Sequence, residues 1–370
     1  HRRNTGYALD ELLKMQPFSD DETPLNLSKL LTGSEGTLAF TTSITLKLED
    51  LPPSKSVMLV LHFDSISKSM KSVESLMKHN LYTCELIDKT ILDCTKDHVG
   101  YSKNRFFLKG DPKAILLLEL RNENLEELKK QLNKLEKQVE DDKLAYENVS
   151  LWGEEIELAN ELRHAGLGLL GNIVGDKKAV ACIEDTAVPL DKLADYIDEF
   201  QNLMERFKQN VVYYAHAGAG ELHLRPILNL KSKKGIQDFR AITLSVAHLV
   251  KKYKGSLSGE HGDGIVRSEF IPIVVGDENY KTFKEIKKIF DSHNIFNPGK
   301  IIDPYPMDKY LRTRLGKSKS LDTAFDFSAD HGLIRATEKC NGAGNCRSVQ
   351  PKGSMCPSYR ATHDEKHNTR

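Results

Sequence analysis

One stretch near the middle of the chain constrains the fold more than any other. An apolar run, Val211-Val-Tyr-Tyr-Ala215, leads into His216-Ala-Gly-Ala-Gly-Glu-Leu-His223, and an alternating run from Leu222 to Ile227 follows. The two glycines permit a tight reversal of direction, so the pattern predicts two strands joined by a short turn. Such a turn would point the rings of His216 and His223 toward one place.

A second glycine-rich loop, Ser258-Gly-Glu-His-Gly-Asp-Gly264, adds Glu260 and His261 to the two imidazoles. Imidazole and carboxylate groups bind small divalent metals, and a neutral imidazole can also act as a base. The six residues between His216 and His223 exclude the helical i, i+4 spacing of a zincin. We therefore predict a catalytic centre on a turn between strands. The alternative is that the histidines only satisfy hydrogen bonds in a glycine-rich turn.

Length, charge and hydropathy limit the number of domains, the class of partner and the location of the protein. The chain has 370 residues, enough for about two or three domains. Lys+Arg and Asp+Glu both number 53, which removes any general electrostatic argument for a nucleic-acid partner. No run of 18 apolar residues is present, so we expect a cytoplasmic protein that is at most peripheral to the inner membrane. Because the sequence begins in mid-pattern at His1, we also expect an internal fragment.

Apolar strands alternate with amphipathic helices over most of the chain, which predicts an α+β fold with helices packed on a sheet. No G-x-G-x-x-G turn supports a dinucleotide-binding Rossmann unit. Strands are expected at Thr41–Leu48, Val57–Phe63, Ala114–Leu120, Ala179–Ile183, Val211–Ala215 and Leu222–Ile227, and helices at 66–77, 125–139, Trp152–Leu169, Leu193–Phe207, 236–253 and Lys281–His293. The leucine stripe at 125–139 covers only two heptads, which favours a helix on a sheet over a coiled coil.

The six cysteines fall into two groups. Three are scattered and are expected to be reduced core residues: Cys84, Cys94 and Cys182. The others, Cys340, Cys346 and Cys356-Pro, lie in the tail after a linker expected at 306–335. Bacterial ferredoxin loops have the spacing C-x2-C-x2-C with a later Cys-Pro. Cys340 and Cys346 occupy the outer two positions and Ala343 the middle one, so the cluster either lacks that ligand or takes it from another residue.

Several ordered motifs together resemble a known family. They are Asn4-Thr-Gly-Tyr7 with Gly33-Ser-Glu-Gly-Thr37, His216 to His223, Ser258-Gly-Glu-His-Gly262, and Asn297-Pro-Gly-Lys300. These residues resemble FAD-linked oxidases and dehydrogenases of D-2-hydroxy acids, a family that includes D-lactate dehydrogenase, the glycolate oxidase flavin subunit and D-2-hydroxyglutarate dehydrogenase. Glu184-Asp-Thr-Ala-Val-Pro189 and Cys356-Pro-Ser-Tyr-Arg360 are similar to the long members, which fuse the flavin enzyme to an iron–sulfur domain.

The resemblance implies a domain organisation. Residues 1–53 would be the end of an FAD-binding domain, residues 54–305 a substrate domain built on an antiparallel sheet with packed helices, 306–335 a linker, and 336–370 the start of a ferredoxin-like helical iron–sulfur domain. FAD would lie against the turn Gly33, Ser34, Glu35, Gly36 and Thr37, and the cluster ligands would be Cys340, Cys346 and Cys356. The main FAD-binding segment would precede this chain, which leaves open whether the chain alone retains flavin.

The resemblance also implies roles for individual residues. His216, His223 and Glu260 would bind a divalent metal, which could be zinc, iron(II) or manganese. His261 would be the base, and Arg163 would bind the carboxylate of a small 2-hydroxy-acid substrate. Arg225 stands where the hydroxyglutarate enzymes have Asn, and their lysine is missing near Ile183, so Arg225 is a candidate for the displaced positive charge.

Electrons would pass from FAD through the iron–sulfur domain to a quinone or an electron-transfer protein. Two other classes stay open from the residues alone. A zinc hydrolase could use the same His/His/Glu site with a metal-bound water, and a non-catalytic electron-transfer module could contain the histidines as structural residues. The sequence does not identify the acid or the oligomeric state.

Overall fold

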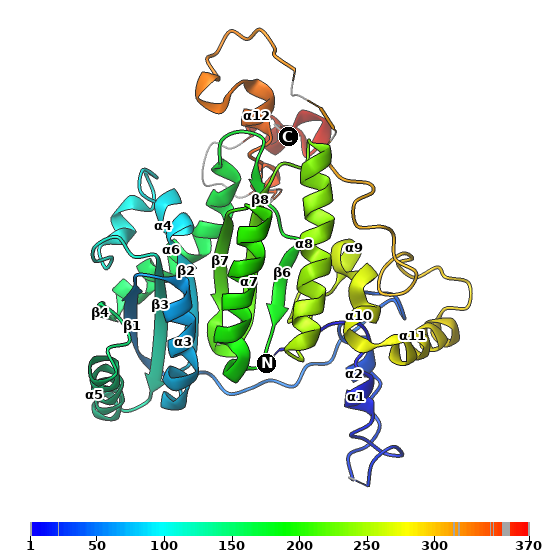
Figure 1. The fold of residues 1–370 in the computed structure, drawn as a ribbon, viewed down its shortest axis with the longest axis horizontal. Coiled ribbons are helices and arrows are strands. Elements are labelled where there is room, and N and C mark those ends of the chain that lie inside the picture. The colour runs from blue at the N-terminus through cyan, green and yellow to red at the C-terminus, as the bar shows by residue number, and fades with distance from the viewer. Residues whose placement is uncertain are drawn as a thin grey trace.

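An antiparallel sheet forms the centre of the fold in the computed structural model. The structure describes residues 2–20, 22–313, 315–316, 319–340, 342, 344–349 and 356–368. Its eight strands follow the order β4-β1-β3-β2-β7-β8-β5, and β6 pairs with β8 beside β5 (Figure 1). The pairings between strands are all antiparallel. The predicted α+β fold, an antiparallel sheet with helices packed on it, is confirmed.

The first half of the sheet is a split βαβ unit, in which two β–α–β segments interleave. Its strand order is β4-β1-β3-β2. The elements are β1 (Lys55–Phe63), α3 (Ile66–Leu76), β2 (Thr83–Asp88), β3 (Ala114–Asn122), α5 (Leu125–Asp141) and β4 (Glu147–Trp152). The central strands β1 and β3 are almost continuously apolar because both of their faces are covered.

The second half repeats this plan. It consists of β6 (Ile183–Ala187), α7 (Leu193–Phe207), β7 (Val211–His216), β8 (Glu221–Leu228) and α8 (Lys233–Lys252). A β-bridge between Ala187 and Ser256 takes the place of a fourth strand. The two units join where β2 pairs with β7, with Leu86 opposite Ala215 and Ile87 opposite Tyr214.

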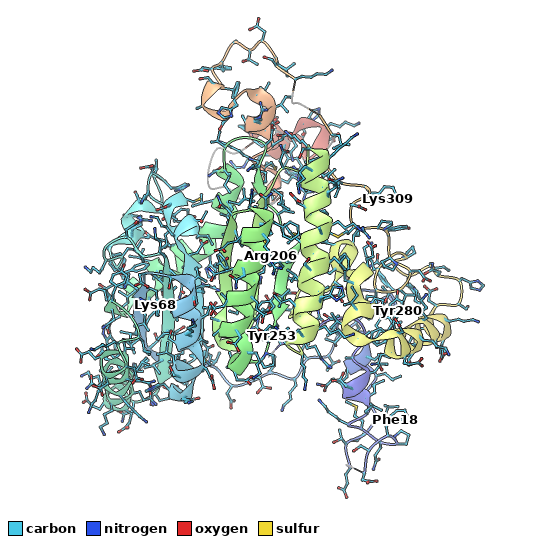
Figure 2. All side chains as sticks on the ribbon, in the orientation of Figure 1. Phe18, Lys68, Arg206, Tyr253, Tyr280 and Lys309 are labelled. Atoms are coloured by element: carbon cyan, nitrogen blue, oxygen red, sulfur yellow. The ribbon has the colours of Figure 1, made fainter. Side chains whose placement is uncertain are left out.

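Helices cover the two faces of the sheet unequally. The largest core cluster contains apolar residues of α3, α5, α7 and α8, which lie on one face. The labelled Lys68 on α3 and Arg206 on α7 are exposed on the outer side of that layer (Figure 2). On the other face, α4 (Lys89–Cys94) and α6 (Glu154–Leu169) pack on residues that belong mainly to the first unit.

The part of this second face that β8 forms is polar. In β8, Leu222 and Leu224 belong to the large core, and the residues that alternate with them are Glu221, His223 and Arg225. Because side chains alternate across a strand, these three point to the opposite face. The sheet therefore presents a row of polar side chains on this face, of which Glu221 and His223 are buried and Arg225 is partly exposed.

The N-terminal residues pack beside the C-terminal part of this domain. Tyr7, Leu30 and Leu38 form a third core with Ile271 and Phe283. The helices involved are α1 (Leu9–Leu12), α2 (Ser28–Leu31), α10 (Ile271–Val275) and α11 (Asp277–Phe290), and α9 (Gly264–Arg267) precedes them along the chain. This packing places the N-terminal segment against the loop that contains Glu260 and His261.

Two expected strands differ from the structure. Thr41–Leu48 forms no strand, and its apolar residues Ile44, Leu46 and Leu48 are exposed. The alternation provides an apolar face, but the segment pairs with no described strand, so the pattern alone cannot make a sheet. The strand expected at Ala179–Ile183 is divided into β5 (Lys178–Ala179) and β6, because residues 180–182 turn between them.

The described residues beyond 301 contain little regular structure. The short helices are α12 (Leu333–Thr337) and α13 (Pro357–Thr362), and α12 crosses the boundary expected at residue 335. Arg335 forms a bidentate ion pair with Asp176, which attaches α12 to the loop before β5. Within the described residues, no helix combines the length and apolar character needed to cross a membrane.

Candidate metal and active site

The turn between β7 and β8 brings the first two histidines to the polar face. His216 ends β7, and a single 3-10 turn, Ala217–Ala219, leads to Gly220, which has a positive φ of 68°. Gly218 has no room for a side chain, since a Cβ there would lie 2.8 Å from Met77 Sδ. The register places His223 opposite Tyr214. The strand–turn–strand geometry expected for this stretch is therefore present.

The three predicted metal ligands converge. His216, His223 and Glu260 each offer a ligand atom, and these atoms all lie within 4.8 Å of one another. The ring centroids of the two histidines are 5.2 Å apart, and His216 Nε2 lies 3.7 Å from Glu260 Oε1. Two imidazoles and a carboxylate at this spacing can hold a divalent cation with open positions for a substrate. That a cation binds here stays a prediction.

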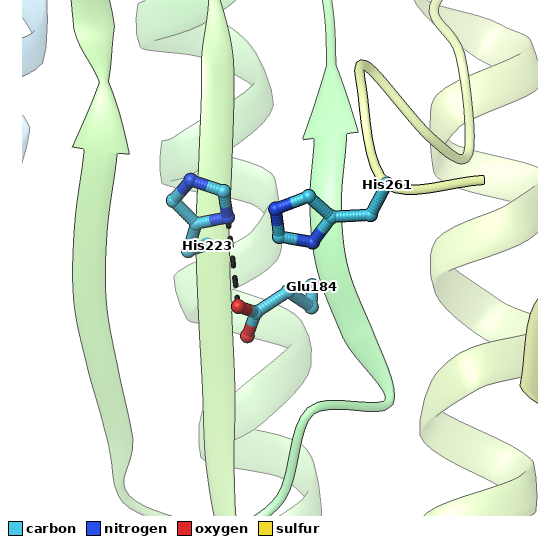
Figure 3. Close-up of side chains that lie close together, drawn as sticks. All are labelled: Glu184, His223 and His261. Atoms are coloured by element: carbon cyan, nitrogen blue, oxygen red, sulfur yellow. Dashed lines mark ion pairs between the residues drawn. The ribbon is translucent and has the colours of Figure 1, made fainter. Parts of the chain in front are cut away.

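His261 completes the cluster. Its ring stacks on that of His223 at a centroid distance of 5.3 Å, and its Nε2 lies 3.4 Å from Glu260 Oε1. The side chain is 46% exposed, so a substrate can reach it. Glu184, His223 and His261 form a second group with ligand atoms within 4.8 Å (Figure 3). Glu184 was not predicted from the sequence as a site residue.

His223 has the environment of a ligand. It is only 3% exposed, and within the described chain its Nδ1 makes no hydrogen bond, although Glu184 Oε1 lies 3.7 Å away. Burial lowers the pKa of His223 to about 4, so the ring is neutral near pH 7 and retains a free lone pair. A buried polar atom without a partner is costly, and a bound cation would relieve that cost. The residues present therefore fit a metal.

A β-bulge fixes the loop that contains Glu260 and His261. The register of β6 against β8 shifts at Asp185, which has a φ of 75°. Its carboxylate accepts hydrogen bonds from the Glu260 and His261 amides at 2.9 and 2.8 Å and from the Ser258 hydroxyl at 2.5 Å. Burial alone would raise the pKa of Asp185, but these bonds and one from Glu221 outweigh it and hold the pKa below its ordinary value.

Glu221 is a second buried carboxyl group beside this loop. It is fully buried, and its Oε2 accepts a hydrogen bond of 2.7 Å from Arg2. Burial and the neighbouring Asp185 raise the pKa of Glu221 to about 8. Burial and the neighbouring carboxylate of Asp185 therefore both favour the neutral form of Glu221.

The Gly33–Thr37 turn also contacts the loop. Glu35 accepts hydrogen bonds from the Asp263 and Gly264 amides, at 2.7 and 3.0 Å. Ser34 and Thr37 are buried, Gly33 lies under the Asn4 side chain, and Gly36 faces open space. In this structure the turn supports the loop that contains Glu260 and His261, and its contact with FAD stays a prediction.

Both candidate substrate arginines form ion pairs with glutamates. Arg163 is 8% exposed, donates to Glu85 Oε2 at 2.5 Å and lies 4.8 Å from the centre of the Tyr214 ring. Arg225 forms a bidentate pair with Glu184, with a distance of 2.5 Å between its terminal nitrogen and Oε1. Glu85 was not identified from the sequence.

The three tail cysteines differ from one another in burial. Cys340 is exposed, Cys346 is half-buried, and Cys356 is buried with its sulfur 3.6 Å from the carbonyl of His367. Within the part of the chain that the structure describes, these sulfurs belong to no group of three or more converging ligands. Ala343, at the middle position of the expected cluster motif, lies outside the described residues. The iron–sulfur cluster stays a prediction.

Comparison with known proteins places this geometry in context. Residues 52–301 match the family model described as FAD linked oxidases, C-terminal domain. The chain is 31% identical over 369 residues to D-2-hydroxyglutarate dehydrogenase of Haemophilus influenzae, covering 97% of this chain and 35% of that protein. It is 32% identical over 376 residues to D-2-hydroxyglutarate dehydrogenase of Pseudomonas putida, covering 98% of this chain and 36% of that protein. Glycolate oxidase subunit GlcD of Bacillus subtilis is 24% identical over 286 residues, covering 77% of this chain and 58% of that protein. The chain thus spans about a third of the length of the first two relatives.

Proposed function

Because this chain belongs to the FAD linked oxidases, whose C-terminal domain matches residues 52–301, we propose that it forms the substrate and metal site of an FAD-dependent dehydrogenase. The proposed reaction is oxidation of a D-2-hydroxy acid to the 2-oxo acid. The observation that supports it best is the convergence of His216, His223 and Glu260 on one point with His261 beside them. D-2-hydroxyglutarate is the first substrate to test, because the first two relatives are named for it.

The cofactors would supply chemistry that the side chains lack. When bound, FAD supplies the acceptor for the two electrons that leave with the hydrogen on Cα. A divalent metal on His216, His223 and Glu260 would lower the pKa of the substrate hydroxyl. We retain zinc, iron(II) and manganese as candidates, since two imidazoles and a carboxylate suit all three.

The side chains of this chain would then handle the proton and the carboxylate. His261 would take the hydroxyl proton, because its Nε2 faces Glu260 and its side chain is exposed enough to release that proton to water. Arg163 or Arg225 would orient a substrate carboxylate, with a guanidinium that can bind it bidentately. Each would do so by exchanging part of its ion pair with Glu85 or Glu184.

The electron path and the location also belong to the proposal. We propose that electrons leave FAD through an iron–sulfur cluster that uses Cys340, Cys346 and Cys356, and reach a quinone or an electron-transfer protein. The charge balance of the chain gives no reason to expect a nucleic-acid partner. We propose a cytoplasmic site of action, with any membrane contact limited to the periphery.

The test is anaerobic titration of the FAD-loaded holoenzyme with D- and L-2-hydroxy acids, starting with D-2-hydroxyglutarate, D-lactate and glycolate. We expect a D-acid to bleach the flavin, and His261→Asn to slow that bleaching by roughly 10²- to 10⁴-fold while flavin content is unchanged. Flavin that stays oxidised with every acid would refute the proposal. Metal-dependent ester hydrolysis without flavin would instead favour the hydrolase.

A further inference from the structure

Glu85 is an ionisable residue in β2, where it lies between the buried residues Cys84 and Leu86. Its neighbours in β2, Cys84 and Leu86, both belong to the large core on one face of the sheet. Glu85 therefore points to the opposite face, where the metal ligands lie. Its side chain is only 15% exposed, so its charge needs a defined partner.

The carboxylate of Glu85 contacts the inner nitrogen of the His216 ring. Nδ1 lies 3.1 Å from Oε1 and 3.0 Å from Oε2. A neutral imidazole has one N–H and one lone pair, and an ionised carboxylate can only accept hydrogen bonds. The proton must then be on Nδ1, which leaves the lone pair on Nε2. Nε2 is the nitrogen that lies 3.7 Å from Glu260 Oε1.

Arg163 holds Glu85 in this position. Its terminal nitrogen donates to Glu85 Oε2 at 2.5 Å, and its guanidinium group lies over the ring of Tyr214. The same nitrogen is 3.3 Å from His216 Nδ1. Because Glu85 Oε2 can accept from both donors, the two nitrogens can be neighbours without bonding to each other. The opposite assignment, with Arg163 donating to an unprotonated Nδ1, would turn the Nε2 proton toward Glu260.

We propose that Glu85 is a positioning residue that holds His216 as the Nδ1–H tautomer, so that the Nε2 lone pair points at the centre formed with His223 and Glu260. This inference rests on the metal site of the proposed function and needs neither flavin nor substrate. A carboxylate behind a metal-binding histidine fixes the ring and raises its basicity, and its loss typically weakens metal affinity by about 10- to 100-fold.

Two measurements on the holoenzyme test the proposal. The first is nitrogen-detected NMR of the ring nitrogens of His216 after metal removal, for which we expect an Nδ1–H and a bare Nε2. The second is the Zn²⁺ affinity of Glu85→Gln, measured by competition with a chelator, for which we expect a loss of about 10- to 100-fold. The NMR measurement uses the native sequence, so it decides the question even if the variant fails to fold.

Glu119→Gln is a matched control. Glu119 lies on the adjacent strand β3, is 4% exposed and pairs with Arg121 at 2.6 Å, but it does not contact the cluster. It should lose a similar ion pair without changing Zn²⁺ affinity. Equal affinities for Glu85→Gln and the native protein, a proton on Nε2, or no Zn²⁺ binding at all would each overturn the inference. Tight Zn²⁺ binding with flavin that no acid reduces would refute the proposed function and leave the role of Glu85 intact.

Discussion

Asp263 is a buried residue of the same glycine-rich loop as Glu260 and His261. Its Oδ2 accepts a hydrogen bond of 2.8 Å from the Gly6 amide, and within the described residues its Oδ1 has no partner. Burial, which outweighs the nearby Arg267, raises the pKa of Asp263 from 3.8 to about 7. Between these values the folded protein binds more protons than the unfolded chain does. The stability that this group contributes is therefore complete below the unfolded pKa and is lost as the pH rises through about 7.

Asp263→Asn should remove this pH dependence. The amide oxygen can still accept from Gly6, but the side chain no longer titrates. We measure the free energy of unfolding of the native protein minus that of the variant. This difference should decrease by on the order of a few kcal/mol between pH 4 and 7. Urea denaturation at a series of pH values, with a chelator present, measures the difference. If the free energies of unfolding of the two proteins change in parallel with pH, Asp263 is not the source of the pH dependence.

Residue type and local spacing predicted that His216, His223, Glu260 and His261 come together, and their side chains do converge. The side chains that orient them were not found, because they come from strands far away in the sequence. Glu85, for example, is 131 residues from its partner His216. The available signal was a glutamate between Cys84 and Leu86, because a charge that is buried among apolar residues needs a partner. Asp185 showed a similar signal, since it follows Ile183-Glu184 in a strand that is buried throughout.

At the scale of elements, clear periodicity predicted the structure well. The helix at Leu193–Phe207 has the bounds expected, and β1 and β3 differ from their predictions by two residues at one end. The short strands β2 and β4 were missed, since neither has a long alternating or apolar run. The stretch Thr41–Leu48 has a strand pattern without a strand, because pairing is a property of two segments and the sequence shows only one.

The bulge at Asp185 gives a prediction at this scale. Asp185→Ala removes three hydrogen bonds to the 258–261 loop and puts alanine at a positive φ. We expect a loss of about 3 kcal/mol or more in the free energy of unfolding. Faster hydrogen exchange is also expected at the Glu260 and His261 amides, which lose their acceptor.

Asn80→Ala separates the cost of backbone strain from the cost of the lost hydrogen bonds. Asn80 has a φ of 54° at the end of a short helix and does not contact the loop. Its replacement should cost about 1–2 kcal/mol from backbone strain alone, with no change in exchange at Glu260 or His261. If both variants accelerate exchange at these two amides equally, the bulge does not anchor the loop.

On the scale of the whole molecule, the site depends on the joining of two split βαβ units. Glu85 comes from the first unit, whereas His216 and His223 come from the second. The units share one sheet through the β2–β7 pairing, and their helices α3 and α7 pack on the same face. The predicted metal ligands lie on the opposite face, beside the helices that cover the first unit, so the junction holds Glu85 against His216.

Asp88 bonds across this junction, and its replacement tests how much the junction contributes. Its Oδ1 caps α4 by accepting from the Ile91 amide, and its Oδ2 accepts from the Tyr213 amide of β7, both at 2.9 Å. Asp88→Ala should lose the cap and leave a buried N–H unpaired, at a cost of about 2–4 kcal/mol in denaturant unfolding. Ser65→Ala removes only a cap, that of α3, and should cost about 1 kcal/mol. If the two losses are equal, the bond to Tyr213 adds nothing, and the β2–β7 ladder and the helices must hold the two units together without it.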